Sequence, residues 1–73
     1  PVYDLMAIPE NITPFDTLEL SQTLGISKSE LKWKIKYART FSVKLPSVIV
    51  GKISREHNAV IQEKIWKYPG FFF

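Results

Sequence analysis

A glycine followed at once by a helix-start signal is the feature that most constrains how this chain folds. Gly25 can adopt the positive φ that ends a helix at little cost. Two residues later, Ser27 stands three residues before Glu30, which is the spacing of a capping box. No proline or glycine follows until Pro46. The sequence therefore predicts a helix over 27–40, starting just after an earlier helix has ended.

The start of the earlier helix is marked by a second signal of the same kind. Thr13 can act as a cap, Pro14 suits the first helical position, and Asp16 lies three residues after the cap. We therefore expect a helix over about 14–24. Residues 13–40 would then form two helices joined by a short turn.

The N-terminal segment, residues 1–12, is too short to form a domain and is closed off by Pro9. We expect it to be an extended arm or a single turn that packs through Val2, Leu5 and Ile8. At the other end of the chain, the tail PGFFF is expected either to pair with another segment or to have been cut from a longer chain.

Residues 41–53 change from helical to alternating periodicity. Phe41, Val43 and Leu45 alternate with polar residues, and a β-branched run follows shortly after Pro46. Alternation and β-branching favour two short strands around a tight turn, which is a β-hairpin.

Helical spacing returns in residues 54–68, where Ile61, Ile65 and Tyr68 lie at offsets of four and three. This spacing predicts a C-terminal helix, followed by the tail at 69–73. The alternative is that the segment AVIQEKI forms a strand after a turn.

The composition fits one small folded domain spanning residues 1–73. Hydrophobic residues make up 45 % of the chain, which is enough for a single core, and there is no cysteine for disulfides or thiolate metal sites. No apolar run approaches the ~20 residues that a membrane span needs. We predict a soluble, mainly α protein with a small β-hairpin; the alternative is a small all-α bundle.

Charge is distributed unevenly along the chain. Residues 1–26 hold four acids and no Lys or Arg, whereas residues 27–73 hold ten bases and three acids, giving net charges of −4 and +7. Such a basic segment is typical of proteins that bind polyanions, because each neutralised phosphate releases counterions. The same charges would also serve ordinary solubility.

On a helical wheel, residues 27–40 divide into a packing face and a charged face. With Leu31 set to zero, Ile35 at about 40° and Ala38 at about 340° lie on either side of it, and the three form the expected core stripe. A sector from about 60° to 160° holds Ser29 and four cations and no apolar residue. We call these cations the cationic sector: Lys28, Lys32, Lys36 and Arg39. Lys34 falls outside it, at about 300°.

Three aromatic residues form another line on this helix, at about 200° to 280°. We call Trp33, Tyr37 and Phe41 the aromatic stripe. Aromatics at offsets of four are more often core than ligand contacts, so we expect Tyr37 and Phe41 to pack against the strands that follow. For Trp33, which borders the polar sector, both interpretations stay open.

The stretch LSQTLGISKSELKWKIKYA, residues 20–38, resembles the helix-turn-helix of bacterial DNA-binding regulators, especially Fis-like and resolvase-like proteins. Ser21 stands where a small residue lets the two helices approach. The matching apolar positions are Leu24 and Ile26 around Gly25, and Leu31 and Ile35 in the second helix. No long helix precedes the pair, so a third layer would come from 41–68. That arrangement is similar to the winged modules of excisionase-like and MerR-like proteins.

The resemblance implies a sequence-specific DNA-binding protein whose helix 27–40 enters the major groove of double-stranded DNA. It would be a small transcriptional regulator or a recombination accessory factor of phage or mobile-element type, binding as a homodimer or cooperative oligomer. It would act in the cytoplasm of a bacterium or on the nucleoid. The implied groove contacts are Ser27, Lys28, Ser29, Lys32, Trp33 and Lys36. The implied backbone contacts are Arg39, Lys44, Lys52 and Arg55. The alternative is that the lysines are solvated and bind no nucleic acid.

A second hypothesis is a protein interaction module that docks through Trp33, Tyr37, Trp66 and the Phe71–Phe73 tail. Enzymatic function is not expected, because the acids and the single histidine, His57, form no catalytic or metal-binding pattern. We also expect no cofactor and no small-molecule substrate.

Overall fold

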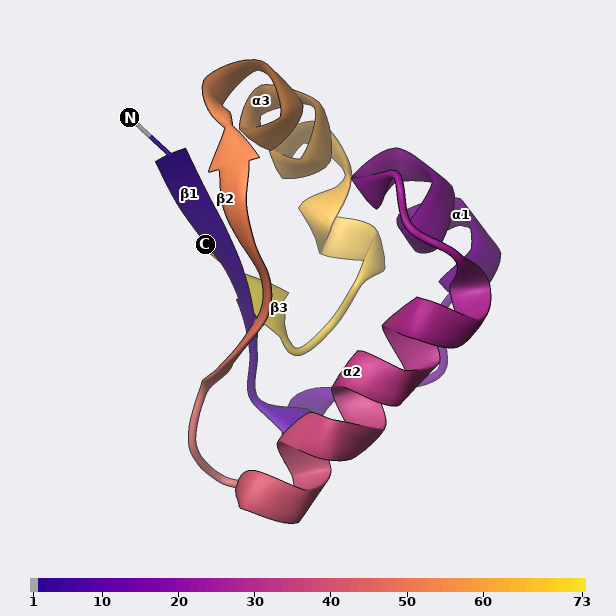
Figure 1. The fold of residues 1–73 in the computed structure, drawn as a ribbon, viewed down its shortest axis with the longest axis vertical. Helices are drawn as coiled ribbons and strands as arrows, with labels where there is room; N and C mark the ends of the chain where they lie inside the picture. The colour runs from indigo at the N-terminus through magenta and orange to yellow at the C-terminus, as the bar shows by residue number, and fades with distance from the viewer. Residues whose placement is uncertain (1) are drawn as a thin grey trace.

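In the computed structural model, which describes residues 2–73, three α-helices cover one face of a three-stranded antiparallel sheet (Figure 1). In chain order the elements are β1 (Val2–Ala7), the 3₁₀ helix η1 (Pro9–Asn11), α1 (Thr17–Leu24), α2 (Lys28–Phe41), β2 (Ser47–Ser54), α3 (Arg55–Lys64), the 3₁₀ helix η2 (Ile65–Lys67) and β3 (Phe71–Phe72). The expectation of a mainly helical chain with a small amount of β-structure is confirmed, but the β-structure is a three-stranded antiparallel sheet. The all-α alternative is wrong.

The first strand lies in the middle of the sheet, in the order β2-β1-β3. Val2 pairs with Ser54 and Ala7 with Ser47, with register shifts between these ends, and Met6 pairs with Phe72. The described part of residues 1–12 is extended and ends in a single 3₁₀ turn, as expected, but it is the central strand of a sheet and not a separate arm; Pro1 lies outside the described residues. Its place in the sheet was missed because both of its partner strands lie 40 or more residues further along the chain.

The predicted hairpin at 41–53 is also wrong. α2 continues to Phe41, residues 42–46 form a loop, and 47–54 form a single strand whose partner is β1. The β-branched run after Pro46 did indicate a strand, which pairs with the distant β1. The alternating residues lie at the end of α2 and in the loop: Phe41, Val43 and Leu45. The described residues therefore contain no hairpin wing after α2.

The two helices around Gly25 form at the predicted place. Gly25 has φ of 75° and caps α1, and the hydroxyl of Ser27 accepts a hydrogen bond from the Glu30 N–H at 3.0 Å. The start of α1 differs from the prediction: the cap is Asp16, whose carboxylate accepts from the Glu19 N–H at 2.9 Å. Residues 12–16 lie outside the helix and run across the molecule toward it.

The C-terminal helix predicted over 54–68 is confirmed, with Ser54 as its cap, and its last turn is the 3₁₀ helix η2. The strand alternative for AVIQEKI is wrong. The tail does pair with another segment, because Phe71 and Phe72 form β3 beside β1.

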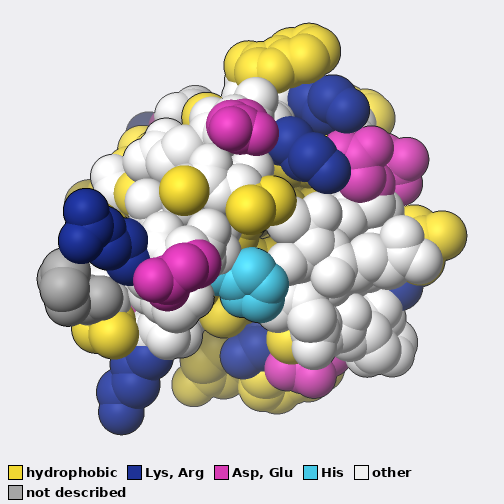
Figure 2. Space-filling model, turned by 90° about the horizontal axis from the view of Figure 1, so that it is seen from above, with side chains coloured by type: hydrophobic (Ala, Val, Ile, Leu, Met, Phe, Trp, Pro, Cys, Tyr) yellow, Lys and Arg dark blue, Asp and Glu magenta, His cyan; other side chains and the backbone are white. Residues whose placement is uncertain are grey.

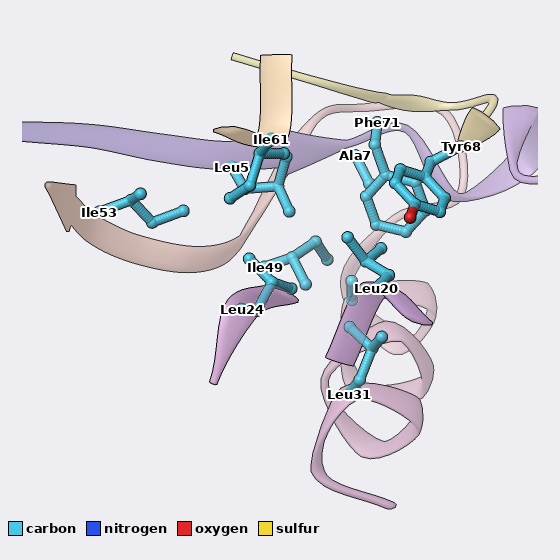
Figure 3. Close-up of a cluster of buried hydrophobic side chains, with 11 residues drawn as sticks. Leu5, Ala7, Leu20, Leu24, Leu31, Ile49, Ile53, Ile61, Tyr68 and Phe71 are labelled. Carbon is cyan, nitrogen blue, oxygen red and sulfur yellow. The ribbon is translucent and has the colours of Figure 1, made fainter. Parts of the chain in front are cut away.

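The core lies between the sheet and the helices (Figure 3). It is built from side chains of one face of each strand and from the inner face of each helix. These are Leu5, Ala7, Leu20, Leu24, Leu31, Ala38, Ile49, Ile53, Ile61, Tyr68 and Phe71. Ser21, at the close approach of α1 and α2, is 1 % exposed, and its hydroxyl donates to the Leu18 carbonyl at 2.8 Å. None of the helices formed by residues 2–73 is long and apolar enough to cross a membrane.

Candidate functional site

The helix α2 uses a narrow stripe for packing and leaves the rest of its surface open. Leu31 and Ala38 are buried and Ile35 packs against the core, as the wheel predicts. The helix stands at the lower right of the molecule in Figure 1, with its far side turned away from the sheet. Its other side chains are therefore the main candidates for contacts with a partner.

The cationic sector is solvent-exposed along the whole length of α2. Lys28, Lys32, Lys36 and Arg39 are all exposed. Among residues 2–73 the ion pairs are Lys34 with Glu30 at 4.0 Å and Lys67 with Glu19 at 3.4 Å, so none of the four is in an ion pair. The sector thus keeps its positive charge available, whereas Lys34, outside it, is partly neutralised.

The two serines at the start of α2 are exposed, but one has a structural task. Ser27 accepts the capping hydrogen bond from Glu30, and its oxygen lies 3.2 Å from the Ser29 hydroxyl. A ligand at this end of the helix would have to share Ser27 with the cap.

The other predicted DNA contacts are divided between two ends of the molecule. Lys44 lies in the loop directly after α2 and is exposed. Lys52 and Arg55 lie at the junction of β2 and α3, which stands at the opposite end from the C-terminus of α2 (Figure 1). Lys52 has φ of 57° and its N–H donates to the Asp4 carboxylate at 3.1 Å. The fold therefore groups Lys44 with the cationic sector and separates Lys52 and Arg55 from it.

The end of the molecule that carries α3 has mixed charge. Figure 2 shows basic and acidic side chains interspersed there with apolar groups and the histidine. This mixture contrasts with α2, where four cations follow one another along a single sector.

The aromatic stripe is exposed, contrary to the prediction that the following strands cover Tyr37 and Phe41; for Trp33 the sequence left both interpretations open. Trp33, Tyr37 and Phe41 are 61 %, 63 % and 75 % exposed. The strand that follows α2 packs against β1 in the sheet, on the core side of the helix, and so cannot reach the stripe. The rings of Trp33 and Tyr37 stack with centroids 5.2 Å apart and an interplanar angle of 9°.

The other aromatics of the interaction hypothesis do not join the stripe. Phe71 is buried at 6 % exposure and Phe73 is partly buried against the core, so these two side chains of the tail do not offer the docking surface that the interaction hypothesis requires. Phe72 is 37 % exposed on the uncovered face of the sheet. Trp66 is 75 % exposed, but it lies on η2, where the Lys67 amine is 5.8 Å from its ring.

A hollow of about 510 Å³ lies on the side of α2 that faces away from the aromatic stripe, beside the cationic sector. Residues 12–15 and Thr17 line one side, and Ile35 and Arg39 line the other. Sequence reasoning missed this hollow, because it depends on where the segment before α1 crosses α2. The only local indication of the hollow was that Arg39 follows Ile35 by one helical turn.

One ionisable cluster serves the fold. The buried Tyr68 hydroxyl donates to the Glu19 carboxylate, which also accepts from the Lys67 amine at 3.4 Å. The bond from Tyr68 is the main reason that the pKa of Glu19 lies below its usual value. Burial, followed by the contact with Glu19, raises the pKa of Tyr68 far above its usual range. The cluster ties η2 to α1.

The described residues contain no group of three His, Cys, Asp or Glu side chains that could hold a metal ion. Comparison of the chain with protein-family models, with curated proteins and with solved structures finds no match. The assignment of a function therefore rests on the geometry of α2 and its surroundings.

Proposed function

We propose that this chain is a binding module without catalytic chemistry, which docks on a partner protein through the aromatic stripe of α2. The observation that carries the proposal is the exposure of Trp33, Tyr37 and Phe41 on successive turns of one helix. Side chains of this size usually bury most of their surface, so three in a line indicate a surface that a partner covers.

The stripe has the size and the order of the apolar centre of a protein contact, which is about half of the ~800 Å² that each partner buries in a typical interface. Three large aromatic side chains exposed by more than half present on the order of 400 Å² of mostly apolar surface. The stacked rings of Trp33 and Tyr37 restrict each other, so less rotamer entropy is lost when a partner binds. Trp and Tyr are also the residue types that most often dominate binding energy at interfaces.

The residue at the outward side of α2, Trp33, favours a protein partner over DNA. The core stripe of α2 is centred near Leu31 on the wheel, and Trp33 lies at about 200° from it, on the side that points outward. A partner that approaches α2 from outside therefore meets Trp33 first, with Tyr37 on one side of it and Lys36 on the other. Base edges and phosphates are contacted mainly by Arg, Lys, Asn and Gln, so a groove-reading helix would carry such residues at this place.

The test is a photo-crosslinking experiment in cells that make the protein. A benzophenone amino acid at position 37 is expected to capture one defined protein, whereas the same group at the exposed position 63 on α3 is not. The captured protein must then bind the purified chain, with affinity lowered at least about tenfold by Trp33→Ala combined with Tyr37→Ala. The proposal fails if purified wild type and the double variant bind it equally. Because these side chains are exposed, the double variant should melt within a few degrees of wild type.

DNA binding is a second candidate, favoured by the four exposed cations of the cationic sector, none of which is in an ion pair within residues 2–73. In that case the chain would bind duplex DNA as a dimer or in arrays, as the helix-turn-helix resemblance implies. Titration of a random 20-base-pair duplex at several salt concentrations measures the number of phosphate contacts directly from the slope. Lys32→Ala with Lys36→Ala should weaken binding and flatten this slope by about two units if the sector meets phosphate. Equal binding by both proteins, or none at low salt, would exclude this candidate.

A further inference from the structure

The hollow between the segment before α1 and the helix α2 has the composition of a binding site for a side chain with a neighbouring negative charge. Ile12 and Phe15 from the segment and Ile35 from α2 are only partly buried against the core, so they leave apolar surface in the hollow. Arg39 stands in its wall. The volume, about 510 Å³, lies within the range of small-ligand pockets.

The hollow has firm walls on both sides. Phe15 makes edge-to-face contacts with the buried rings of Tyr68 at 5.9 Å and Phe71 at 5.3 Å, which anchor the segment to the core. On the other side, α2 is held by its buried Leu31 and Ala38. A ligand would therefore find the apolar surface largely formed before it binds.

The charge around the hollow has one sign on the side of α2. Arg39 is exposed and is not in an ion pair with any described carboxylate. Lys36 and Lys32 continue the cationic sector away from it at offsets of three and seven. None of the residues that line the hollow is acidic; Asp16, between the lining residues Phe15 and Thr17, does not line it, and its carboxylate caps α1. An acidic ligand thus meets a guanidinium first and further cations behind it.

We propose that this hollow binds an acidic segment of a partner protein, with one large apolar side chain inserted between Phe15 and Ile35 and an adjacent carboxylate on Arg39. A guanidinium binds a carboxylate through two parallel hydrogen bonds, which fixes the orientation of the segment. Further acidic residues of the same segment lie along Lys36 and Lys32. The site is on the opposite flank of α2 from the aromatic stripe and does not depend on it.

The charge complementarity and the hollow together select this occupant over a nucleic acid. Duplex DNA presents phosphates at a convex surface and has no apolar group that would fill a hollow lined by Ile12, Phe15 and Ile35. An acidic segment with an apolar anchor uses both features at once.

The probe is the peptide acetyl-EELFEE-amide, followed by amide chemical shifts of the ¹⁵N-labelled chain. We expect saturable shifts at the amides of residues 12, 13, 15–17 and 35–39. The neutral peptide acetyl-QQLFQQ-amide and the anchorless peptide acetyl-EEAAEE-amide should each bind at least about tenfold more weakly, because each lacks one of the two contacts.

Matched variants of the protein separate specific binding from general attraction to a basic chain. Arg39→Gln should weaken the acidic peptide about tenfold, whereas Lys34→Gln, which removes an equal charge outside the cationic sector, should change its affinity less than about twofold. Thr13→Glu adds a carboxylate at the exposed rim and should also weaken binding.

Three results would overturn the proposal. They are shifts centred on Trp33 and Tyr37 instead of the hollow, equal affinity for the acidic and the neutral peptide, and equal effects of Arg39→Gln and Lys34→Gln. If a duplex DNA shifts the resonances of the segment before α1 and the peptide does not, Arg39 binds phosphate and the proposal is wrong. Loss of the aromatic-stripe contact in the crosslinking experiment leaves this result unaffected, because the two sites use different residues.

Discussion

Tyr68 is the largest side chain that the fold buries fully, and its hydroxyl ends on the carboxylate of Glu19. A buried hydroxyl is stable only when it has a partner, and here that partner is held on α1 while Tyr68 follows η2. One hydrogen bond therefore joins two elements that are distant in sequence.

Replacing this residue as Tyr68→Phe should lower stability at neutral pH and change its dependence on pH. The pKa of Glu19 is lowered in the folded state, so its contribution is present above its ordinary value of 4.5 and is lost as the pH falls through the folded pKa. The pKa of Tyr68 is raised, so its contribution is present below 10 and is lost as the pH rises further. Urea unfolding from pH 2 to 11 should show both losses in wild type and a flatter profile in the variant. Parallel profiles would contradict this role.

Two glycines with positive φ differ in what surrounds them, and this difference predicts different sensitivities. Gly25, at φ of 75°, has no atom within 4 Å of an added Cβ, so Gly25→Ala should cost about 1 kcal/mol from the backbone alone, and Gly25→Asn less. At Gly70 an added Cβ would lie 2.7 Å from the backbone nitrogen of Ile12. Gly70→Ala should therefore cost more than about 2 kcal/mol. Equal costs in urea unfolding would refute the distinction.

At the scale of elements, the corrected start of α1 gives a direct prediction. Asp16→Ala removes the cap and should destabilise the protein by about 1 kcal/mol, whereas Thr13→Ala should stay within about 0.5 kcal/mol. The free energy of unfolding from urea titration measures both. A larger loss of stability from Thr13→Ala than from Asp16→Ala would show that Thr13 is the cap, as the sequence predicted.

The elements that could be predicted from sequence are those whose signals are local. Ser27 with Glu30 and Gly25 placed α2 to within one residue, because caps act within a single turn. The signal for the start of the first helix was ambiguous, because Asp16 could be either the capping-box partner of Thr13 or the cap itself. In the structure the Asp16 carboxylate is the cap of α1.

The parts that could not be predicted depend on pairing between distant segments. The sequence of β1 alone predicts only an extended segment, and its central place in the sheet depends on pairing with β2 and β3. The same applies to the candidate sites: the wheel found the cationic sector, because it needs only the helix, but it could not decide whether the aromatic stripe was covered. The hollow needed both Phe15 and Ile35 in their tertiary positions.

At the scale of the whole molecule, the central position of β1 makes the first residues essential to the fold. Leu5 points into the core with 0 % exposure, so Leu5→Ala should cost about 2 to 5 kcal/mol. Val2, on the same strand, is 64 % exposed, and Val2→Ala should cost less than about 0.5 kcal/mol. Thermal unfolding of the two variants distinguishes a central strand from a loosely attached arm, for which both effects would be small.

The molecule as a whole separates packing from binding. The sheet and the inner sides of the helices hold the core, and α2 is left with an aromatic stripe on its outward side and cations beside a hollow on its flank. This division lets the exposed side chains be changed without loss of the fold, so effects on binding can be measured in folded variants.

The most direct test of the proposed function is the affinity of the protein captured at position 37 for purified variants of this chain, measured by isothermal titration calorimetry. Trp33→Ala with Tyr37→Ala should weaken binding at least about tenfold, and Trp66→Ala, which removes an equally exposed ring from η2, should leave it within about twofold. Raising the salt concentration should change the wild-type affinity only slightly. Equal effects of the two changes, or a steep loss with salt that the aromatic variants do not alter, would contradict docking through the aromatic stripe.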